Sequence, residues 1–253
     1  MTQSPTTPLT LLSPLDGWAA PLEETPDAVF AERMLGDGVA IDPTGGVLCA
    51  PCDGEVLSVH HTGHAISLRT AGGAEILIHI GLETVGLSGE GFEVHVKNGQ
   101  AVAAGERLIS FDMEVIARRA KSLITPIIVT NGDAFFITAR TQGRSVRVGE
   151  ALMELTPMAA IADGSASASA RDGEALRHVT VTHGHGLHAR PAALLANAAK
   201  LSAARLEVVF GERSANARSP VAVMALGVRA GDLVTLKALG EDALAAVEAL
   251  ALV

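Results

Sequence analysis

Aromatic side chains are scarce in this sequence of 253 residues, which has no Tyr, one Trp and six Phe. Proteins that bind nucleic acid neutralise phosphates with basic side chains, and many stack bases on aromatic rings. Here 28 acidic residues outnumber 19 basic ones, for a formal net charge of −9. Both shortages argue against nucleic acid as a partner.

Cysteines are also few, and long apolar runs are absent. Two cysteines, Cys49 and Cys52, cannot build the disulfide framework of a small secreted protein. The N-terminus lacks the basic start and apolar run of a signal peptide, and no stretch reaches about 18 uncharged apolar residues. We therefore expect a cytoplasmic protein with no transmembrane segment. Its 48% hydrophobic residues suffice for a buried core.

A break in composition divides the sequence. Residues 156–176, read as TPMAAIADGSASASARDGEAL, are small and turn-prone, which is typical of a linker. Residues 1–157 carry 10 basic and 19 acidic side chains, whereas residues 178–253 carry 7 and 6. We therefore predict a domain over 1–157, a flexible linker over 158–177 and a second domain over 178–253.

The first domain is predicted to be an all-β sandwich or barrel. Its apolar and β-branched runs are short and are bounded by Gly, Pro, Asn and Asp, which is typical of antiparallel folds. One helix is expected, over residues 113–122. The predicted strands include residues 54–59, 65–70, 75–80, 107–111, 127–130 and 135–138.

The second domain alternates strands and helices, which predicts a small open α/β sandwich. Its expected strands are 179–182, 206–210 and 233–238, and its expected helices cover residues 191–200, follow Ser219-Pro220 and begin near Asp242.

Two histidines of the first domain lie in or beside apolar strands, in the segments HTGHAISL and ILIHIGLET. A hairpin through the intervening AGG turn would bring the rings of His64 and His79 together. They are either hydrogen-bonded core histidines or a pair in which one ring fixes the tautomer of the other and leaves a nucleophilic nitrogen. The cost of burying imidazole among Ile and Leu makes the pair worth testing as a site.

The segment GLHARPAA places His188 just before a helix, because Pro191 suits a first helical turn. Helix dipole, backbone amides and the guanidinium of Arg190 would then stabilise a dianionic group on the His188 ring. This combination favours a site over an ordinary loop histidine.

Other motifs are incomplete. Gly184-x-Gly186-x-x-Ala189 mimics a dinucleotide fingerprint, but only 64 residues follow it. Cys49 and Cys52 have redox spacing but open no βαβ unit, so we expect buried or half-buried thiols. The stretch 111–114 lacks the lysine of a lipoyl or biotinyl carrier.

A histidine-rich stretch raises the question of zinc. His60, His61 and His64 accompany His79 in the first domain. Neighbours on a strand point to opposite faces, so His60 and His61 would not ligate from one side. We expect no dedicated metal site and no cofactor, although adventitious zinc on His64 and His79 stays open.

The motifs carry a resemblance to two families. Residues 8–157 resemble the glucose-type IIA proteins of the bacterial phosphoenolpyruvate:sugar phosphotransferase system, through GGVLCAPCDGEV, TGHAISL and ILIHIGLETV. Residues 178–253 resemble the histidine phosphocarrier HPr, through VTHGHGLHARPAA and SANARSPVAVMALGVRAGD. The resemblance implies a β-sandwich joined to an open-faced βαββαβα domain, both of them phosphoryl carriers.

The resemblance also implies roles for individual residues. His79 would carry the phosphoryl group on Nε2, His64 would hydrogen-bond the phosphate, and Thr62 would belong to a hydrogen-bond relay. In the second domain His188 would be phosphorylated on Nδ1, with Arg190 countering the charge. Ser219 matches a serine that is regulatory in many HPr proteins or caps a helix; before Pro220 we expect the cap.

By the same resemblance, phosphate would come from Enzyme I and leave to the IIB domain of a IIB/IIC sugar permease. Fusions of this kind continue into Enzyme I, a domain that this sequence does not contain. The alternative is a regulatory module that binds target proteins according to its phosphorylation state. Transfer from His188 to His79 within one chain is expected if the two sites can meet.

Overall fold

The computed structural model describes residues 8–158 and 173–253, which form two compact units. The first unit ends with a strand at Pro157. The second begins with a strand at Glu174, so residues 174–177 belong to its sheet and not to the predicted linker. The rest of the predicted linker, apart from Met158 and Gly173, lies outside the described residues.

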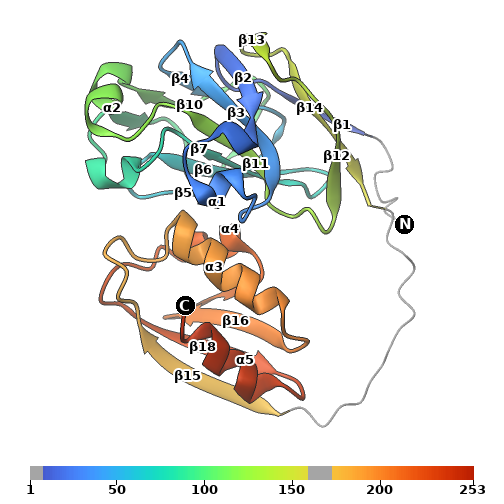
Figure 1. Ribbon diagram of the computed structural model, residues 1–253, viewed down its shortest axis with the longest axis vertical. Coiled ribbons are helices and arrows are strands. Elements are labelled where there is room, and N and C mark those ends of the chain that lie inside the picture. The colour runs from blue at the N-terminus through green and yellow to red at the C-terminus, as the bar shows by residue number, and fades with distance from the viewer. Residues whose placement is uncertain (1–7, 159–172) are drawn as a thin grey trace. The chain divides into compact units, whose positions relative to one another are not determined.

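The first unit is built from antiparallel strands in three sheets, as predicted (Figure 1). The strands are β1 (Leu9–Leu12), β2 (Gly17–Pro21), β3 (Asp37–Pro43), β4 (Val47–Cys49), β5 (Gly54–Val59), β6 (Ala65–Thr70), β7 (Glu75–His79), β8 (Phe92–Val94), β9 (Ala101–Val102), β10 (Arg107–Phe111), β11 (Thr125–Val129), β12 (Phe135–Arg140), β13 (Arg144–Val146) and β14 (Ala151–Pro157). Short helices accompany them, namely η1 (Leu22–Glu24), α1 (Ala28–Ala31), η2 (Thr84–Leu87) and α2 (Met113–Arg119).

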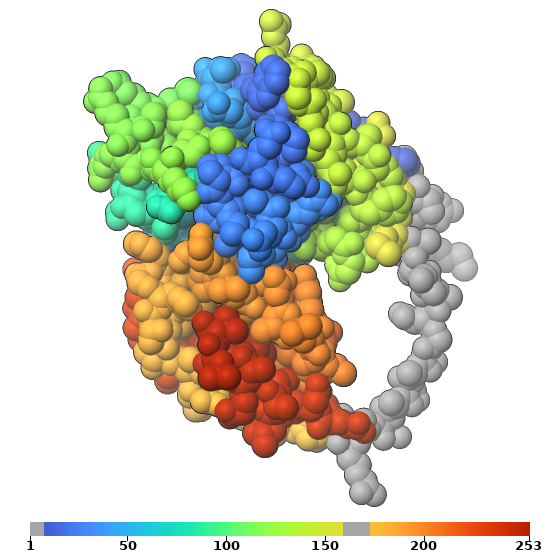
Figure 2. Space-filling model, in the orientation of Figure 1, coloured from blue at the N-terminus to red at the C-terminus, as the bar shows by residue number. Residues whose placement is uncertain are grey.

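The largest sheet has the order β13-β2-β3-β11-β7-β6-β5-β9, and the smaller ones are β1-β14-β12 and β4-β10-β8. The central strands β7 and β11 are mainly apolar, and Ile76, Ile78 and Ile127 are fully buried in the core. Strands near the two ends of the unit lie side by side, since β2 pairs with β13 and the blue surface adjoins yellow-green residues in Figure 2. Strand β7, which ends at His79, lies in the interior of the largest sheet, between β11 and β6.

The second unit has the predicted βαββαβα order (Figure 1). Its elements are β15 (Glu174–Thr180), α3 (Ala189–Lys200), β16 (Arg205–Phe210), β17 (Arg213–Asn216), α4 (Pro220–Ala225), β18 (Leu233–Leu239) and α5 (Ala243–Leu250). The antiparallel sheet has the order β15-β18-β16-β17.

Alternation along β18 shows how the second unit makes its core. Val234, Leu236 and Ala238 are buried, whereas Leu233 is 60% exposed. The buried side chains pack in one cluster with apolar residues of α3 and α5. The helices therefore cover one face of the sheet, as an open-faced sandwich requires. Within the described ranges, no helix is long and apolar enough to span a bilayer.

Candidate functional sites

The His64 and His79 rings meet at one end of the β6–β7 hairpin. Ala65 pairs with His79 in the antiparallel register, and the Ile80 amide donates to the His64 carbonyl at 2.8 Å. The ring centroids are 4.8 Å apart, with the planes at 66°. The AGG turn thus brings the two imidazoles together as the sequence predicted.

His79 is only 7% exposed, and its ring meets the edge of Phe30 at a centroid distance of 5.3 Å. Its Nδ1 donates to the Gly81 carbonyl oxygen at 2.7 Å. Because a carbonyl only accepts, Nδ1 carries the ring proton and Nε2 keeps its lone pair. Burial lowers the pKa of His79, against smaller opposing effects from the Gly81 carbonyl and the Asp27 charge. The site therefore holds a neutral imidazole with a nucleophilic Nε2.

Gly81 holds the turn that places this carbonyl. Its φ is +65°, and a Cβ there would lie 2.8 Å from both the Ser122 carbonyl oxygen and the Thr84 Cγ2. Leu82, the next residue, also contacts Ser122, because its amide donates to the Ser122 carbonyl oxygen at 2.8 Å. The spacing of polar residues in the sequence does not reveal this role.

His64 is 2% exposed, and its Nδ1 shares a hydrogen bond with Thr62 Oγ1. Thr62 Oγ1 also lies 2.9 Å from Nδ1 of His60. His60 and His61 were predicted to point to opposite faces of a strand, and this is wrong. Both follow the end of β5, and their rings lie 4.4 Å apart. His60 therefore belongs to the same cluster as Thr62 and His64, although the sequence analysis gave His60 no role in the site.

In the second unit, His188 is the N-cap residue of α3, with extended backbone angles. Gly186, two residues before His188, leaves no room for a side chain. A Cβ at this position would lie 2.1 Å from the Val228 carbonyl oxygen, so only glycine fits. Arg190 is exposed in the first turn, and the His185 ring lies 6.0 Å from the His188 ring. The structure thus brings His188, Arg190 and the positive end of a helix dipole together.

Ser219 caps the next helix. Its side chain accepts a hydrogen bond from the Ala222 amide at 3.2 Å, and Pro220 opens α4. The expected cap is therefore present. Arg218, beside it, donates to the carbonyl oxygen of Ala199 in the last turn of α3 and to those of Ser202 and Ala204 in the loop that follows. Sequence reasoning did not find this contact.

The cysteines are free thiols, with Cys52 buried and Cys49 half-buried, as predicted. Burial raises the pKa of Cys52 to about 11 and raises that of Cys49 as well. Neither thiol has the low pKa of a redox nucleophile. Among the described residues, no group of three or more His, Cys, Asp or Glu is arranged to hold a metal ion.

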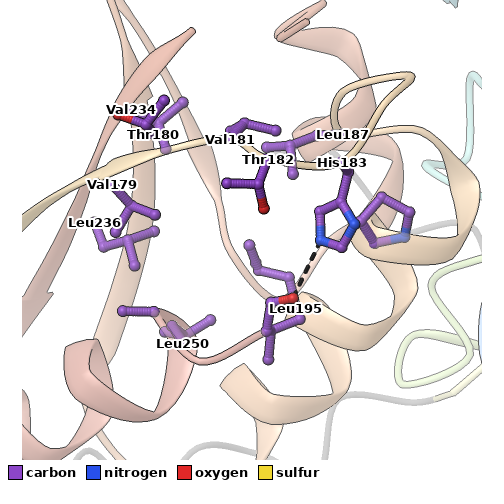
Figure 3. A pocket seen from close by; sticks show the side chains of 13 residues that line it. Val179, Thr180, Val181, Thr182, His183, Leu187, Leu195, Val234, Leu236 and Leu250 are labelled. Carbon is purple, nitrogen blue, oxygen red and sulfur yellow. Dashed lines mark hydrogen bonds between the residues drawn. The ribbon is translucent and has the colours of Figure 1, made fainter. Parts of the chain in front are cut away.

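The second unit also contains a cavity of about 290 Å³ (Figure 3). Its walls are mainly apolar and come from β15, α3, β18 and α5 and their flanking residues, with Thr180, Thr182 and His183 as polar members. His183 Nε2 lies 3.1 Å from the Val253 backbone oxygen. Neither His188 nor Arg190 lines this cavity, so it is separate from the candidate site.

Comparisons with known proteins match both units. Residues 9–135 match the family model for the phosphoenolpyruvate-dependent sugar phosphotransferase system, EIIA 1. Residues 176–253 match the model for the PTS HPr component phosphorylation site.

Individual relatives support the first match. The glucose-specific EIIA component of Bacillus cereus is 60% identical over 125 residues, which cover 49% of this chain and 76% of that protein. The glucose-specific EIIBCA component of Corynebacterium glutamicum is 52% identical over 125 residues, covering 49% of this chain and 18% of that one. The structure of glucose permease IIA from Mycoplasma capricolum is 39% identical, covers 58% of this chain and 96% of that chain, and has a TM-score of 0.57.

Proposed function

Because this chain belongs to the EIIA 1 family of the phosphoenolpyruvate-dependent sugar phosphotransferase system and continues into an HPr domain, we propose that it passes phosphate from His188 to His79. The chain is a phosphoryl-carrier component of that system and works as a transferase through phosphohistidine. The observation that carries the residue assignment is the bond from His79 Nδ1 to Gly81, because it keeps Nε2 available as the nucleophile.

The transfer from His188 to His79 exchanges one N–P bond for another. The lone pair of His79 Nε2 attacks phosphorus in line as the bond from phosphorus to His188 Nδ1 breaks. The proton stays on His79 Nδ1, which keeps its hydrogen bond to the Gly81 carbonyl oxygen. His64, with its ring 4.8 Å from that of His79, binds the arriving phosphoryl group. At His188, Arg190 and the start of α3 stabilise the phosphoryl group before it leaves.

The proposed donor to His188 is Enzyme I, and the proposed acceptor from His79 is a IIB domain. The Corynebacterium glutamicum relative supports the acceptor, since EIIA, IIB and IIC components are named within that one protein. The cytoplasmic location stays a prediction.

The join between the domains supports transfer within one chain. Residues 158–173 connect the two units, and a flexible tether of about 16 residues has an r.m.s. span of roughly 22 Å and gives an effective concentration on the order of millimolar. A mixture of His188→Ala chains and His79→Ala chains permits only transfer between chains. If label reached His79 in this mixture as fast as in the intact chain, transfer within one chain would be excluded.

The test of the whole relay is incubation with Enzyme I and labelled phosphoenolpyruvate. The intact chain should carry label on both histidines, His79→Ala only on His188, and His188→Ala on neither. Equal labelling of His79 in His188→Ala would contradict the order of transfer.

An apolar surface beside the site favours a second candidate function, the binding of target proteins according to phosphorylation state. Phe92 and Val94 lie next to Gly63 in the loop of His64, and Val94 is 40% exposed. Label that enters His188 and stalls there would favour this regulatory function over the relay.

A further inference from the structure

Thr62 Oγ1 lies between two imidazole nitrogens, and this sets a limit on where the protons can be. It shares hydrogen bonds with His60 Nδ1, at 2.9 Å, and with His64 Nδ1. A hydroxyl has one proton and two lone pairs, so Thr62 donates to at most one of the two rings. When Thr62 donates to His64, His60 must therefore donate to Thr62 from Nδ1, and this links the tautomer of His60 to that of His64.

Three arrangements satisfy both bonds when the rings are neutral. In the first, His60 Nδ1–H donates to Thr62, Thr62 donates to His64 Nδ1, and His64 carries its proton on Nε2. In the second, every donor is reversed, and in the third both rings donate from Nδ1 to Thr62; in both of these His64 Nε2 holds a lone pair. The Thr62 amide donates to His60 Nδ1 at 3.4 Å, a long bond that weakly favours the second arrangement in the absence of phosphate.

A phosphoryl group on His79 selects the first arrangement. Its oxygens are negative, and the His64 ring lies 4.8 Å from the His79 ring. An Nε2–H donates to such an oxygen, whereas an Nε2 lone pair repels it. We propose that His60 is a positioning residue, which acts through Thr62 to hold His64 as the Nε2–H tautomer that binds the phosphoryl group on His79. This inference deepens the proposed function and rests on it.

The loop is built to keep His60 in this place. The His60 amide donates to the Ala65 carbonyl at 2.9 Å, and the Gly63 amide donates to the His60 carbonyl at 2.7 Å. The His60 ring also packs against the His64 ring, with centroids 4.4 Å apart and the planes tilted by 59°. The His60 ring is half-buried, and the backbone bonds and the His64 ring restrict its motion. It can therefore keep its hydrogen bond to Thr62 with little further loss of side-chain entropy.

Four variants of the full chain separate this role from packing. His60→Phe keeps a ring and removes Nδ1, whereas His60→Asn keeps a donor at the δ position. Thr62→Val removes the connecting hydroxyl, and the double variant His60→Phe/Thr62→Val tests whether His60 acts through Thr62. His61→Phe is the matched control, because it removes an exposed imidazole from the same loop.

Each chain is labelled with Enzyme I and labelled phosphoenolpyruvate, and loss of label from His79 is followed together with the ¹⁵N spectrum of the His64 ring. We expect His60→Phe to lose label about three- to tenfold faster than the unsubstituted chain and to show His64 moving toward the Nδ1–H form. His60→Asn should restore both readouts, His61→Phe should change neither, and the double variant should behave like Thr62→Val.

The outcomes separate the two proposals. If the unsubstituted chain takes label on His79 but His60→Phe retains its label and its His64 tautomer, the role of His60 is refuted and the proposed function stands. Additive losses in the double variant would also refute it, since they show that His60 acts independently of Thr62. If no label reaches His79 in the unsubstituted chain, both proposals fall.

Discussion

The imidazole of His79 and the carbonyl oxygen of Gly81 are joined by a 2.7 Å hydrogen bond from Nδ1. This bond turns a buried histidine into a nucleophile with one defined reactive atom, because the proton is held on the nitrogen that points to the backbone. Burial contributes in the same direction, since it disfavours the charged ring that has no lone pair to offer.

Gly81→Ala should therefore damage both stability and phosphorylation. The added Cβ meets the Ser122 carbonyl oxygen at 2.8 Å, and the φ of +65° is strained for alanine. We expect a loss of about 1–3 kcal/mol in the free energy of unfolding and slower labelling of His79. Unfolding of the first unit can be followed in urea by the fluorescence of Trp18, the only tryptophan in the chain.

Gly86→Ala is the control for that variant, because a Cβ at Gly86 meets no heavy atom within 4 Å. It should leave stability and labelling near those of the unsubstituted chain. Equal effects of the two substitutions would show that glycine as such, and not the turn at Gly81, accounts for the loss.

Acid should weaken the first unit through His79. The folded pKa of His79 lies below the ordinary value of 6.5, so the unfolded chain binds this proton more readily than the folded one. Stability from this group is complete above pH 6.5 and falls on acidification until the folded pKa is passed, by at most about 1.4 kcal/mol for each pH unit. Urea unfolding followed by Trp18 between pH 7.5 and 5 measures the slope, which should be smaller in His79→Gln. A slope unchanged by that substitution would assign the acid sensitivity to other groups.

Much of the fold was predictable because its local signals agree. Three predicted strands, 54–59, 65–70 and 107–111, coincide with β5, β6 and β10, where Gly or Asp bounds an apolar run. Strand β17 was missed, since the tetrapeptide RSAN has no apolar alternation and is held by its pairing with β16.

The site was predictable in its histidines and not in their surroundings. His64, His79 and His188 stand out by residue type and motif. The Phe30 ring reaches His79 from a helix 49 positions earlier, and only the folded chain shows that contact. His60 was misplaced because the alternation rule for strands fails in the loop that follows β5.

Arg218 should be a major support of the second unit. Its guanidinium donates at 2.6–3.3 Å to one carbonyl oxygen in the last turn of α3, where the helix dipole is negative, and to two in the following loop. Arg218→Met should cost about 1–3 kcal/mol in thermal unfolding followed by circular dichroism. Arg218→Lys should recover only part of this loss, because a lysine ammonium cannot place its N–H donors on all three carbonyl oxygens as the planar guanidinium does. Full recovery by lysine would show that charge alone is needed.

The thiols of Cys49 and Cys52 should react slowly while the chain is folded. With its pKa raised to about 11, Cys52 has roughly a three-hundredth as much thiolate at pH 7.5 as a cysteine with the ordinary pKa of about 8.5 has in the same buffer. Titration with a chromogenic disulfide reagent should therefore give slow release in buffer and rapid release of both thiols in urea. Cys52→Ser identifies which thiol gives each phase, and the slower phase should vanish in that variant. Rapid release in buffer, or ready formation of a disulfide between the two, would instead indicate the redox pair that their spacing imitates.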